Sequence, residues 1–321
     1  MNKRKILVVG AGAIGGIYAA YASKLADVTV LDTNADHVAA IREKGLALSG
    51  TADLVAKLEA FTSPSEMGRR RFDAVVILVK SQITALAFSG IKPCLEGRPL
   101  LVTFQNGMGN VDALEPLCDF DIAHGVSFEA GRYIGPGKID HFIHGEGSFM
   151  GPARGPVESV QWLGDLWTGT GLPTTVEADP RGAIWGKFIF NCVMNPCGAI
   201  VLGMNRARYD VPQMREIIDS MFAEGIAVAE AQGIKLPYDP MHLVKKLRAG
   251  EIPFTKHAGS MAVDVANGRE TEIEALTGYM VRKGKSLGVP TPVSETVYKI
   301  AKGVEYAAQL KKKEAAGSPA G

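Results

Sequence analysis

A short apolar run that leads into a glycine-rich loop constrains the fold of this 321-residue chain more than any other feature. Residues 5–9 are almost continuously apolar, as expected for a central parallel strand buried on both faces. The glycines of the loop allow a tight turn, close approach of a pyrophosphate and close packing of the following helix. The sequence therefore predicts a dinucleotide-binding Rossmann domain, and the residues predicted to contact the cofactor are Gly10, Gly12, Ala13, Ile14 and Gly15.

Asp32 ends the second predicted strand, residues 28–31, where dinucleotide-binding domains often place an acidic residue. A carboxylate there can accept hydrogen bonds from both ribose hydroxyls of the cofactor, and it would repel a 2′-phosphate. The other interpretation is a turn or cap residue at the start of residues 32–36. The ribose interpretation predicts that NAD(H) is preferred over NADP(H), with Asp32 as a cofactor contact.

The alternation of strands and helices continues along the first half of the chain. Residues 72–79 and 100–104 are further buried strands, and Lys80 and Asn106 follow their ends. Ligands of a doubly wound sheet bind beyond the carboxyl ends of its strands, so both residues are predicted cofactor contacts. The alternative for Asn106 with the glycine after it is a simple turn.

The residue pattern changes after Pro180: apolar residues now recur at helical spacing, and runs of β-branched residues become rarer. Helices are predicted over residues 215–232, in segments over 261–288, and from residue 294. These patterns predict three parts: a dinucleotide-binding domain of residues 1–179, a helical substrate and catalytic domain of residues 180–310, and a flexible tail of residues 311–321.

Residues 185–196 form a predicted helix that is apolar on nearly every side, with a proline as its first breaker. Lys187, Asn191 and Asn195 interrupt it, each four residues after the last, and this spacing places them on one stripe. A buried ammonium or amide without partners is costly, so the stripe is predicted to line a polar cleft that binds a ligand. The alternative is a structural ion pair with two amides that satisfy nearby backbone groups.

Composition and charge exclude several classes of function. The chain is 46% hydrophobic and 21% charged, as in an ordinary globular protein, and its net charge of +1 predicts neither nucleic-acid nor membrane binding. No run predicts a signal peptide or a transmembrane helix, so a cytoplasmic location is expected. The four cysteines contain no CxxC pair and are predicted to be reduced core thiols. No metal site is predicted, since His141 and His144 point to opposite faces of a strand and His124 adds no clear third ligand.

The sequence resembles the ketopantoate reductases (2-dehydropantoate 2-reductases) over nearly its whole length. The matching motifs are the glycine loop, Val79-Lys80, Asn106-Gly-Met-Gly109, Lys187 with Asn191 and Asn195-Pro196, Ser260-Met261 with Asp264, Gly268-Arg269 with Thr271-Glu272-Ile273, and Gly288-Val-Pro-Thr-Pro292. The resemblance implies a Rossmann domain joined to an all-α domain, with the active site in the cleft between them. It also implies a hydride transfer between a nicotinamide cofactor and a 2-oxo or 2-hydroxy acid, most simply 2-dehydropantoate and pantoate.

The resemblance assigns roles to individual residues. Lys187 matches the catalytic lysine, which protonates the substrate carbonyl as hydride arrives, and Glu272 matches an acid that orders the cofactor and the lysine. Asn191 and Asn195 match contacts to substrate oxygens, and Ser260 matches a contact to the substrate carboxylate. Lys80 and Asn106 again match cofactor contacts. By its position alone, Ser260 is a helix cap or an anion contact.

Several residues depart from the family pattern. His257 stands where many members have an asparagine that touches substrate, so it is included among the predicted substrate contacts. Together with Asp32 it suggests an alternative, an NAD-dependent and catabolic dehydrogenase of another branched or polyhydroxylated acid. A non-catalytic dinucleotide-binding regulator is the alternative from another class, and retention of Lys187 argues against it. A flavoprotein shares only the glycine loop, and a homodimer is the expected assembly.

Overall fold

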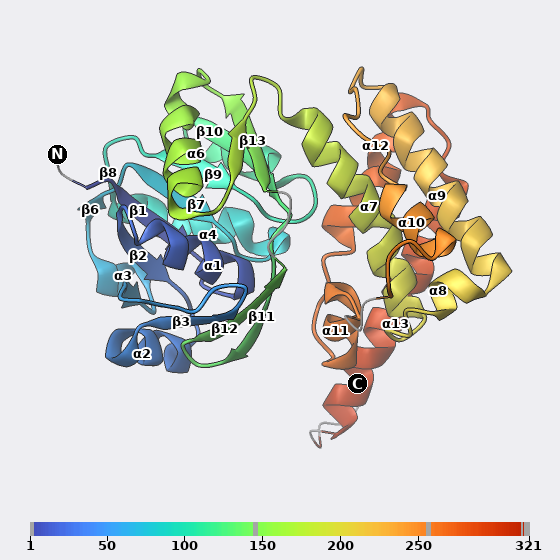
Figure 1. The fold of residues 1–321 in the computed structure, drawn as a ribbon, viewed down its shortest axis with the longest axis horizontal. Coiled ribbons are helices and arrows are strands. Elements are labelled where there is room, and N and C mark those ends of the chain that lie inside the picture. The colour runs from blue at the N-terminus through green and yellow to red at the C-terminus, as the bar shows by residue number, and fades with distance from the viewer. Residues whose placement is uncertain (1–2, 144–146, 255–257, 316, 318–321) are drawn as a thin grey trace. The chain divides into compact units, whose positions relative to one another are not determined.

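The computed structural model describes residues 3–143, 147–254, 258–315 and 317. The chain divides into two compact units, one of residues 1–105 and 110–180 and the other of residues 106–109 and 181–321 (Figure 1). The sequence predicted a single division after residue 179. The structure differs because the turn Asn106–Gly109 belongs to the second unit, where the Met108 amide donates to the Ala275 carbonyl over 2.9 Å.

An eight-stranded sheet forms the centre of the first unit, in the order β14-β13-β10-β9-β7-β1-β2-β5. The strands from β10 to β5 are parallel, whereas β13 runs antiparallel to β10. The strand bounds are β1 Lys5–Val9, β2 Asp27–Leu31, β5 Glu59–Phe61, β7 Ala74–Ile77, β9 Leu100–Thr103, β10 Ile122–Ser127, β13 Ser148–Arg154 and β14 Thr174–Val176. The unit's helices are α1 Ala13–Ala22, α2 Ala35–Lys44, α3 Pro64–Met67, α4 Thr84–Ile91, α5 Asn110–Leu114 and α6 Glu158–Thr170.

Strand β1 is buried on both faces, as the apolar run predicted. Ile6 and Val8 belong to the core on the side of α1 and α6, whereas Leu7 and Val9 belong to the core on the other side. Alternation of side chains along a strand explains this division. The predicted Rossmann fold of the first unit is therefore confirmed.

A second, four-stranded sheet covers α1, and the sequence analysis did not predict it. Its order is β11-β12-β3-β4, with bounds β3 Leu46–Gly50, β4 Leu54–Ala56, β11 Ala130–Gly135 and β12 Lys138–Ile143. Gly16 of α1 packs so closely on Ile139 that a β-carbon would overlap its side chain. The strands are short and half-exposed, so their apolar pattern is weak in the sequence. A third pairing joins β6 Arg70–Arg71 and β8 Leu95–Glu96.

The regular elements among the described residues of the second unit are all helices, which confirms the predicted all-α part. Its elements are α7 Arg181–Ile200, α8 Ala207–Asp210, α9 Pro212–Glu230, α10 His242–Ala249, α11 Ser260–Ala266, a π-helical segment Glu274–Gly278, α12 Tyr279–Leu287 and α13 Pro292–Ala315. Helix α7 packs against α9, α11, α13 and the π-helical segment, so it lies at the centre of this unit. None of the helices described is both long and apolar enough to cross a bilayer.

Two helix ends differ from the sequence prediction. Helix α7 continues through Pro196 to Ile200, although the proline was expected to end it. Helix α13 extends to Ala315, beyond residue 310, because its last residues are mostly lysine, glutamate and alanine, which favour helix. Lys312 and Lys313 also lie in its last turn, where positive charge is favourable.

The four cysteines are free thiols. Cys192 and Cys197 of α7 are fully buried, as predicted, and burial raises the pKa of Cys197 to about 12. Cys94 and Cys118 are only half-buried, so the prediction that all four cysteines lie in the core does not hold for these two.

Candidate active site

The glycine loop lies between β1 and α1 and has the packing that a dinucleotide site requires. Gly10 has a φ of 91°, and a β-carbon on it would lie 2.8 Å from the Leu78 carbonyl oxygen. A β-carbon on Gly15 would overlap the Gly10 carbonyl oxygen, whereas nothing lies within 4 Å of one on Gly12. Gly10 and Gly15 therefore serve protein packing, and Gly12 leaves open space at the start of α1. No acidic side chain lies in the first turn of α1, so this helix end fits a phosphate.

Asp32 has a structural role at the end of β2. Its Oδ2 accepts from the Ala11 amide over 2.8 Å, and its Oδ1 accepts from the Asn34 amide over 2.9 Å. The carboxylate thus ties the glycine loop to the turn before α2. These bonds agree with the turn interpretation of Asp32, and its contact with the ribose stays a prediction.

His37 also supports the glycine loop, and sequence reasoning missed it. The Gly137 amide donates to its Nδ1 over 2.9 Å, so the ring proton lies on Nε2, which donates to the Ala11 carbonyl at 2.9 Å. The ring is buried and joins the loop to the second sheet. No local pattern could have identified it, because its partners lie 26 and 100 residues away.

A buried polar network links the carboxyl ends of β7 and β9. The Gln105 amide group donates to the Val79 carbonyl and to the Thr84 hydroxyl, both over 2.7 Å. Its Oε1 accepts from Thr103 over 2.8 Å. These bonds hold the strand end that precedes Asn106 and the segment that contains Lys80, the two predicted cofactor contacts.

The structure brings Asn106 together with a predicted substrate contact. The Asn191 side chain donates to the Asn106 Oδ1 over 3.4 Å, within the second unit. The turn after Asn106 is held on the π-helical segment, where a β-carbon on Gly107 would lie 2.7 Å from the Ala275 carbonyl oxygen. Asn106 is therefore positioned by the helical unit.

The polar stripe of α7 differs in burial from the rest of the helix. Lys187 and Asn195 are partly exposed and Asn191 is 9% exposed, while most neighbouring apolar residues are enclosed. The helix passes through Pro196 because the Thr277 hydroxyl donates to the Cys192 carbonyl over 2.7 Å. That carbonyl is the one that an amide at position 196 would normally bond, and proline has none.

The remaining predicted residues lie in two other segments of the second unit. Ser260 is the first residue of α11 and is exposed, and Gly259 before it is the N-cap, without a side-chain cap bond, so Ser260 is no helix cap. Glu272 is partly exposed, and its carbonyl accepts from the Ala275 and Leu276 amides at the start of the π-helical segment. The neighbouring Thr271 donates to Glu305 over 2.6 Å. His257 lies outside the described residues.

One buried histidine pairs with an acid in the first unit. His141 bonds Glu129 through Nε2 over 2.6 Å, and both side chains are enclosed in the first unit. Within the described chain no three His, Cys, Asp or Glu side chains gather as metal ligands, and His144 lies outside that part. The absence of a metal stays a prediction.

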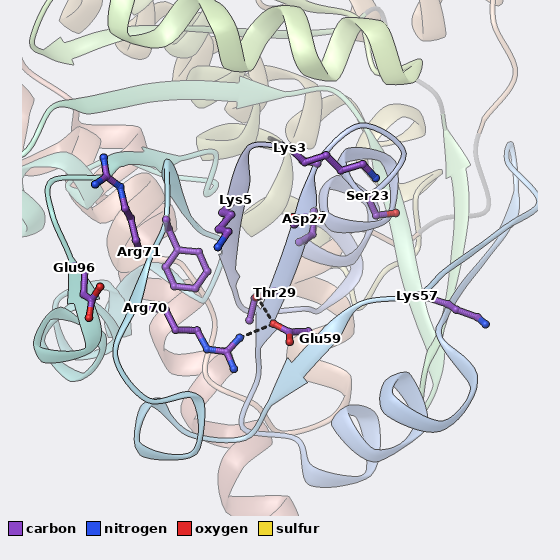
Figure 2. Close-up of a pocket in the computed structure, with 13 residues that line it drawn as sticks. Lys3, Lys5, Ser23, Asp27, Thr29, Lys57, Glu59, Arg70, Arg71 and Glu96 are labelled. Atoms are coloured by element: carbon purple, nitrogen blue, oxygen red, sulfur yellow. Dashed lines mark hydrogen bonds and ion pairs between the residues drawn. The ribbon is translucent and has the colours of Figure 1, made fainter. Parts of the chain in front are cut away.

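A cavity of about 750 Å³ opens at the amino ends of β1, β2 and β5, the opposite end of these strands from Gly10 and Asp32 (Figure 2). Arg70 points toward Glu59 there, while Lys57 points away (Figure 2). The cavity contains none of the predicted site residues, and its lining is a mixture of cations and carboxylates. It is not the candidate active site.

Comparison with known proteins assigns the family. Residues 6–152 match the model of "Ketopantoate reductase PanE/ApbA", and residues 179–305 match the model of its C-terminal part. A PanE/ApbA family ketopantoate reductase from Ralstonia eutropha JMP134 is 30% identical, with a TM-score of 0.82 over 95% of this chain and 99% of that one. The chain belongs to the ketopantoate reductase family. Members of this family are oxidoreductases that act on a CH–OH group.

Other relatives agree with this assignment. A 2-dehydropantoate 2-reductase of Halobacterium salinarum is 28% identical over 299 residues, which are 91% of this chain and 96% of the relative. D-mandelate dehydrogenase, solved with NADH and anilino(oxo)acetate, has a TM-score of 0.81 over 95% of this chain and 99% of that one. It is 23% identical, so that likeness concerns the fold.

The predicted preference for NAD(H) over NADP(H) is wrong. The curated relatives are 2-dehydropantoate 2-reductases, and these enzymes depend on NADPH. Each Asp32 oxygen accepts a backbone amide, so this acid also has a structural reason to be present. The presence of an acidic residue after the second strand therefore does not by itself determine the cofactor.

Proposed function

We propose that the protein reduces 2-dehydropantoate to pantoate with NADPH, with Lys187 as the general acid. The observation that carries the proposal is the stripe of Lys187, Asn191 and Asn195, the less enclosed side of an otherwise buried helix. This helix lies in the part of the chain that matches the C-terminal model of the family. NADPH supplies the hydride, and the open space at Gly12 accommodates its pyrophosphate.

Each residue of the stripe has a defined task in this proposal. The Lys187 ammonium stabilises the negative charge that develops on the substrate oxygen and then donates a proton to it. Asn191 and Asn195 donate hydrogen bonds to the other substrate oxygens, and the bond to Asn106 sets the orientation of the Asn191 amide. Ser260 binds the substrate carboxylate through its exposed hydroxyl. Glu272 orders the lysine and the cofactor.

The first experiment is a steady-state comparison of NADPH and NADH as donors to 2-dehydropantoate. The proposal expects fast turnover with NADPH. Binding of NADPH without turnover of 2-dehydropantoate or of other 2-oxo acids would instead favour the non-catalytic regulator.

The Lys187→Ala variant tests the catalytic role. Loss of a general acid typically lowers turnover by about 10²–10⁴-fold, and the Kd for NADPH should change by less than about threefold. Lys235, which follows α9, provides a matched lysine-to-alanine control outside the stripe. Equal losses in turnover for the two variants would contradict the assignment.

The expected homodimer stays a prediction, which sedimentation equilibrium would test.

A further inference from the structure

The turn Asn106–Gly109 has little rigidity of its own. Gly107 and Gly109 both have a positive φ, 88° and 91°. Glycine adopts many backbone conformations at similar energy, so a turn rich in glycine keeps one conformation only where neighbouring groups hold it. The turn carries Asn106, which is a predicted cofactor contact and bonds the Asn191 side chain. The groups that hold this turn therefore determine how Asn106 is presented.

One hydroxyl group joins the two ends of the turn. The Thr84 Oγ1 accepts from the Gln105 side-chain amide over 2.7 Å and donates to the Asn110 Oδ1 over 3.0 Å. Gln105 is the residue before the turn, and Asn110 is the residue after it. A hydroxyl has a single proton to donate, and Thr84 uses it on one end of the turn while its oxygen accepts from the other end.

The surroundings of Thr84 make these two bonds effective. Thr84 is 0% exposed, Asn110 is 1% exposed and Gln105 is 7% exposed. Hydrogen bonds in such an interior meet little competition from water and are electrostatically stronger than at a surface. Thr84 is also the first residue of α4, and its branched side chain has restricted rotation about χ1. The hydroxyl is therefore a fixed point to which both ends of the turn are bonded.

The middle of the turn is held by a different group. The Met108 amide donates to the Ala275 carbonyl of the helical unit, as described above. Thr84, Gln105 and Asn110 all belong to the first unit. Asn106 lies between the two anchors, since it directly follows Gln105 and precedes Met108 by two residues. Loss of the anchor at the ends would leave Asn106 held from one side only.

We propose that Thr84 is a positioning residue of the active site. Its hydroxyl joins the two ends of the turn and so holds the Asn106 amide in the orientation that contacts NADPH and bonds Asn191. The inference rests on the proposed function, since it takes Asn106 as a cofactor contact and Asn191 as a substrate contact. Because Thr84 is enclosed, it acts through Asn106 and touches neither ligand.

The competing explanation is that Thr84 only stabilises the first unit. Removal of a buried hydroxyl lowers the free energy of unfolding in either case, because its partners lose their bonds. Stability therefore does not separate the two explanations. They differ in whether the effect of Thr84 on ligand binding depends on the Asn106 side chain.

The main experiment uses Thr84→Val, which keeps the shape of the side chain and removes both bonds. The Kd for NADPH, from a fluorescence titration, should rise about fivefold, the effect of one neutral hydrogen bond. The KM for 2-dehydropantoate should rise by a similar factor through Asn191. The value of kcat should fall less than about twofold, because Lys187 is not part of the turn. Thr84→Ser keeps the hydroxyl and should restore both constants to within about twofold of the wild type.

A double-mutant cycle with Asn106→Ala identifies the connection. In that background Thr84→Val should change the Kd for NADPH by less than about twofold, because the amide to be positioned is no longer present. An equal rise in both backgrounds would show that Thr84 acts through general stability, and no rise in either would show that the turn does not need it. Both results would overturn the proposal.

Thr170→Val is the matched control in the same unit. Thr170 is 5% exposed, and its hydroxyl donates to the Trp167 carbonyl over 2.7 Å at the end of α6. Its replacement should also lower stability, but it should leave the Kd for NADPH and the KM for 2-dehydropantoate within about twofold of the wild type. Changes as large as those in Thr84→Val would contradict a specific role of Thr84.

Hydrogen exchange without ligands tests the turn directly. The Met108 amide should exchange about fivefold faster in Thr84→Val than in the wild type, and Thr170→Val should not change it. Equal rates in the wild type and Thr84→Val would refute the role of the two bonds. Exchange and NADPH binding do not require turnover, so they also separate this proposal from the proposed function. If 2-dehydropantoate is not reduced, the proposed function fails, whereas a rise in Kd that depends on Asn106 would still support the role of Thr84.

Discussion

Thr277 explains how a proline can lie inside the central helix of the second unit. Pro196 lacks an amide proton, so the Cys192 carbonyl loses its partner within α7. The Thr277 hydroxyl takes that place over 2.7 Å, and both residues are fully buried. The Cys192 carbonyl therefore keeps a hydrogen-bond partner, although it lies in the part of α7 that carries the predicted substrate stripe.

Replacement of Thr277 by valine should destabilise the protein. The variant keeps the shape of the side chain and leaves a buried carbonyl unpaired, which costs about 1–3 kcal/mol. The expected result is a lower urea midpoint, while Thr277→Ser, which keeps a hydroxyl, should lose less.

The same prediction has an internal control in Pro196→Ala. Alanine restores an amide that can bond the Cys192 carbonyl, so Thr277→Val should cost less in this background, by about 1 kcal/mol. Additive effects of the two substitutions would show that the carbonyl is not the connection between them.

At the scale of elements, Gly15 and Gly12 of the glycine loop have different roles, one in packing and one in the predicted binding of the cofactor. A β-carbon on Gly15 would overlap the backbone of Gly10, whereas a β-carbon on Gly12 would meet no protein atom within 4 Å. The motif in the sequence predicts these two roles, close approach of the pyrophosphate at Gly12 and close packing at Gly15, and the contacts of the two positions agree with that division.

Substitution by alanine should therefore affect Gly12 and Gly15 differently. Gly15→Ala forces a backbone shift, and a loss of at least about 3 kcal/mol in the free energy of unfolding is expected. Gly12→Ala should cost at most about 1 kcal/mol, from the weaker N-cap. It should nevertheless raise the Kd for NADPH tenfold or more, because the methyl group occupies the space for the pyrophosphate. Calorimetric Tm values and a fluorescence titration with NADPH measure both effects, and unchanged NADPH binding by Gly12→Ala would contradict the assignment.

At the scale of the whole molecule, one histidine makes stability depend on pH. His124 of β10 keeps part of its surface exposed, yet burial of its ring lowers its pKa to about 4 from the ordinary value of 6.5. The folded pKa is below the unfolded one, so the unfolded chain binds more protons between these values. The contribution is complete above pH 6.5 and is lost as the pH falls toward 4.

The His124→Gln variant should remove this part of the pH dependence. Between pH 7 and pH 5 the wild-type protein should lose about 1–2 kcal/mol more of its unfolding free energy than the variant. Urea unfolding at the two pH values measures the difference. Parallel pH profiles of the two proteins would mean that the ring can be protonated in the folded state.

Local patterns in the sequence determined the order of the main elements and most of the candidate site. The both-face burial of β1, the glycine loop and the stripe of α7 all follow from periodicities within about 20 residues. The family followed from motifs along the chain, and the comparisons confirm it. The roles of the site residues stay predictions, because their chemistry depends on a bound substrate.

Only the tertiary structure decided which distant residues meet. The contacts of Asn106 with Asn191 and of Thr277 with Cys192 each span 85 residues, and no local period encodes them. The second sheet and the placement of the Asn106–Gly109 turn in the helical unit also depend on contacts between distant residues. Asp32 illustrates the physical reason: the sequence shows a carboxylate, and only the folded chain places the Ala11 and Asn34 amides where its oxygens accept them.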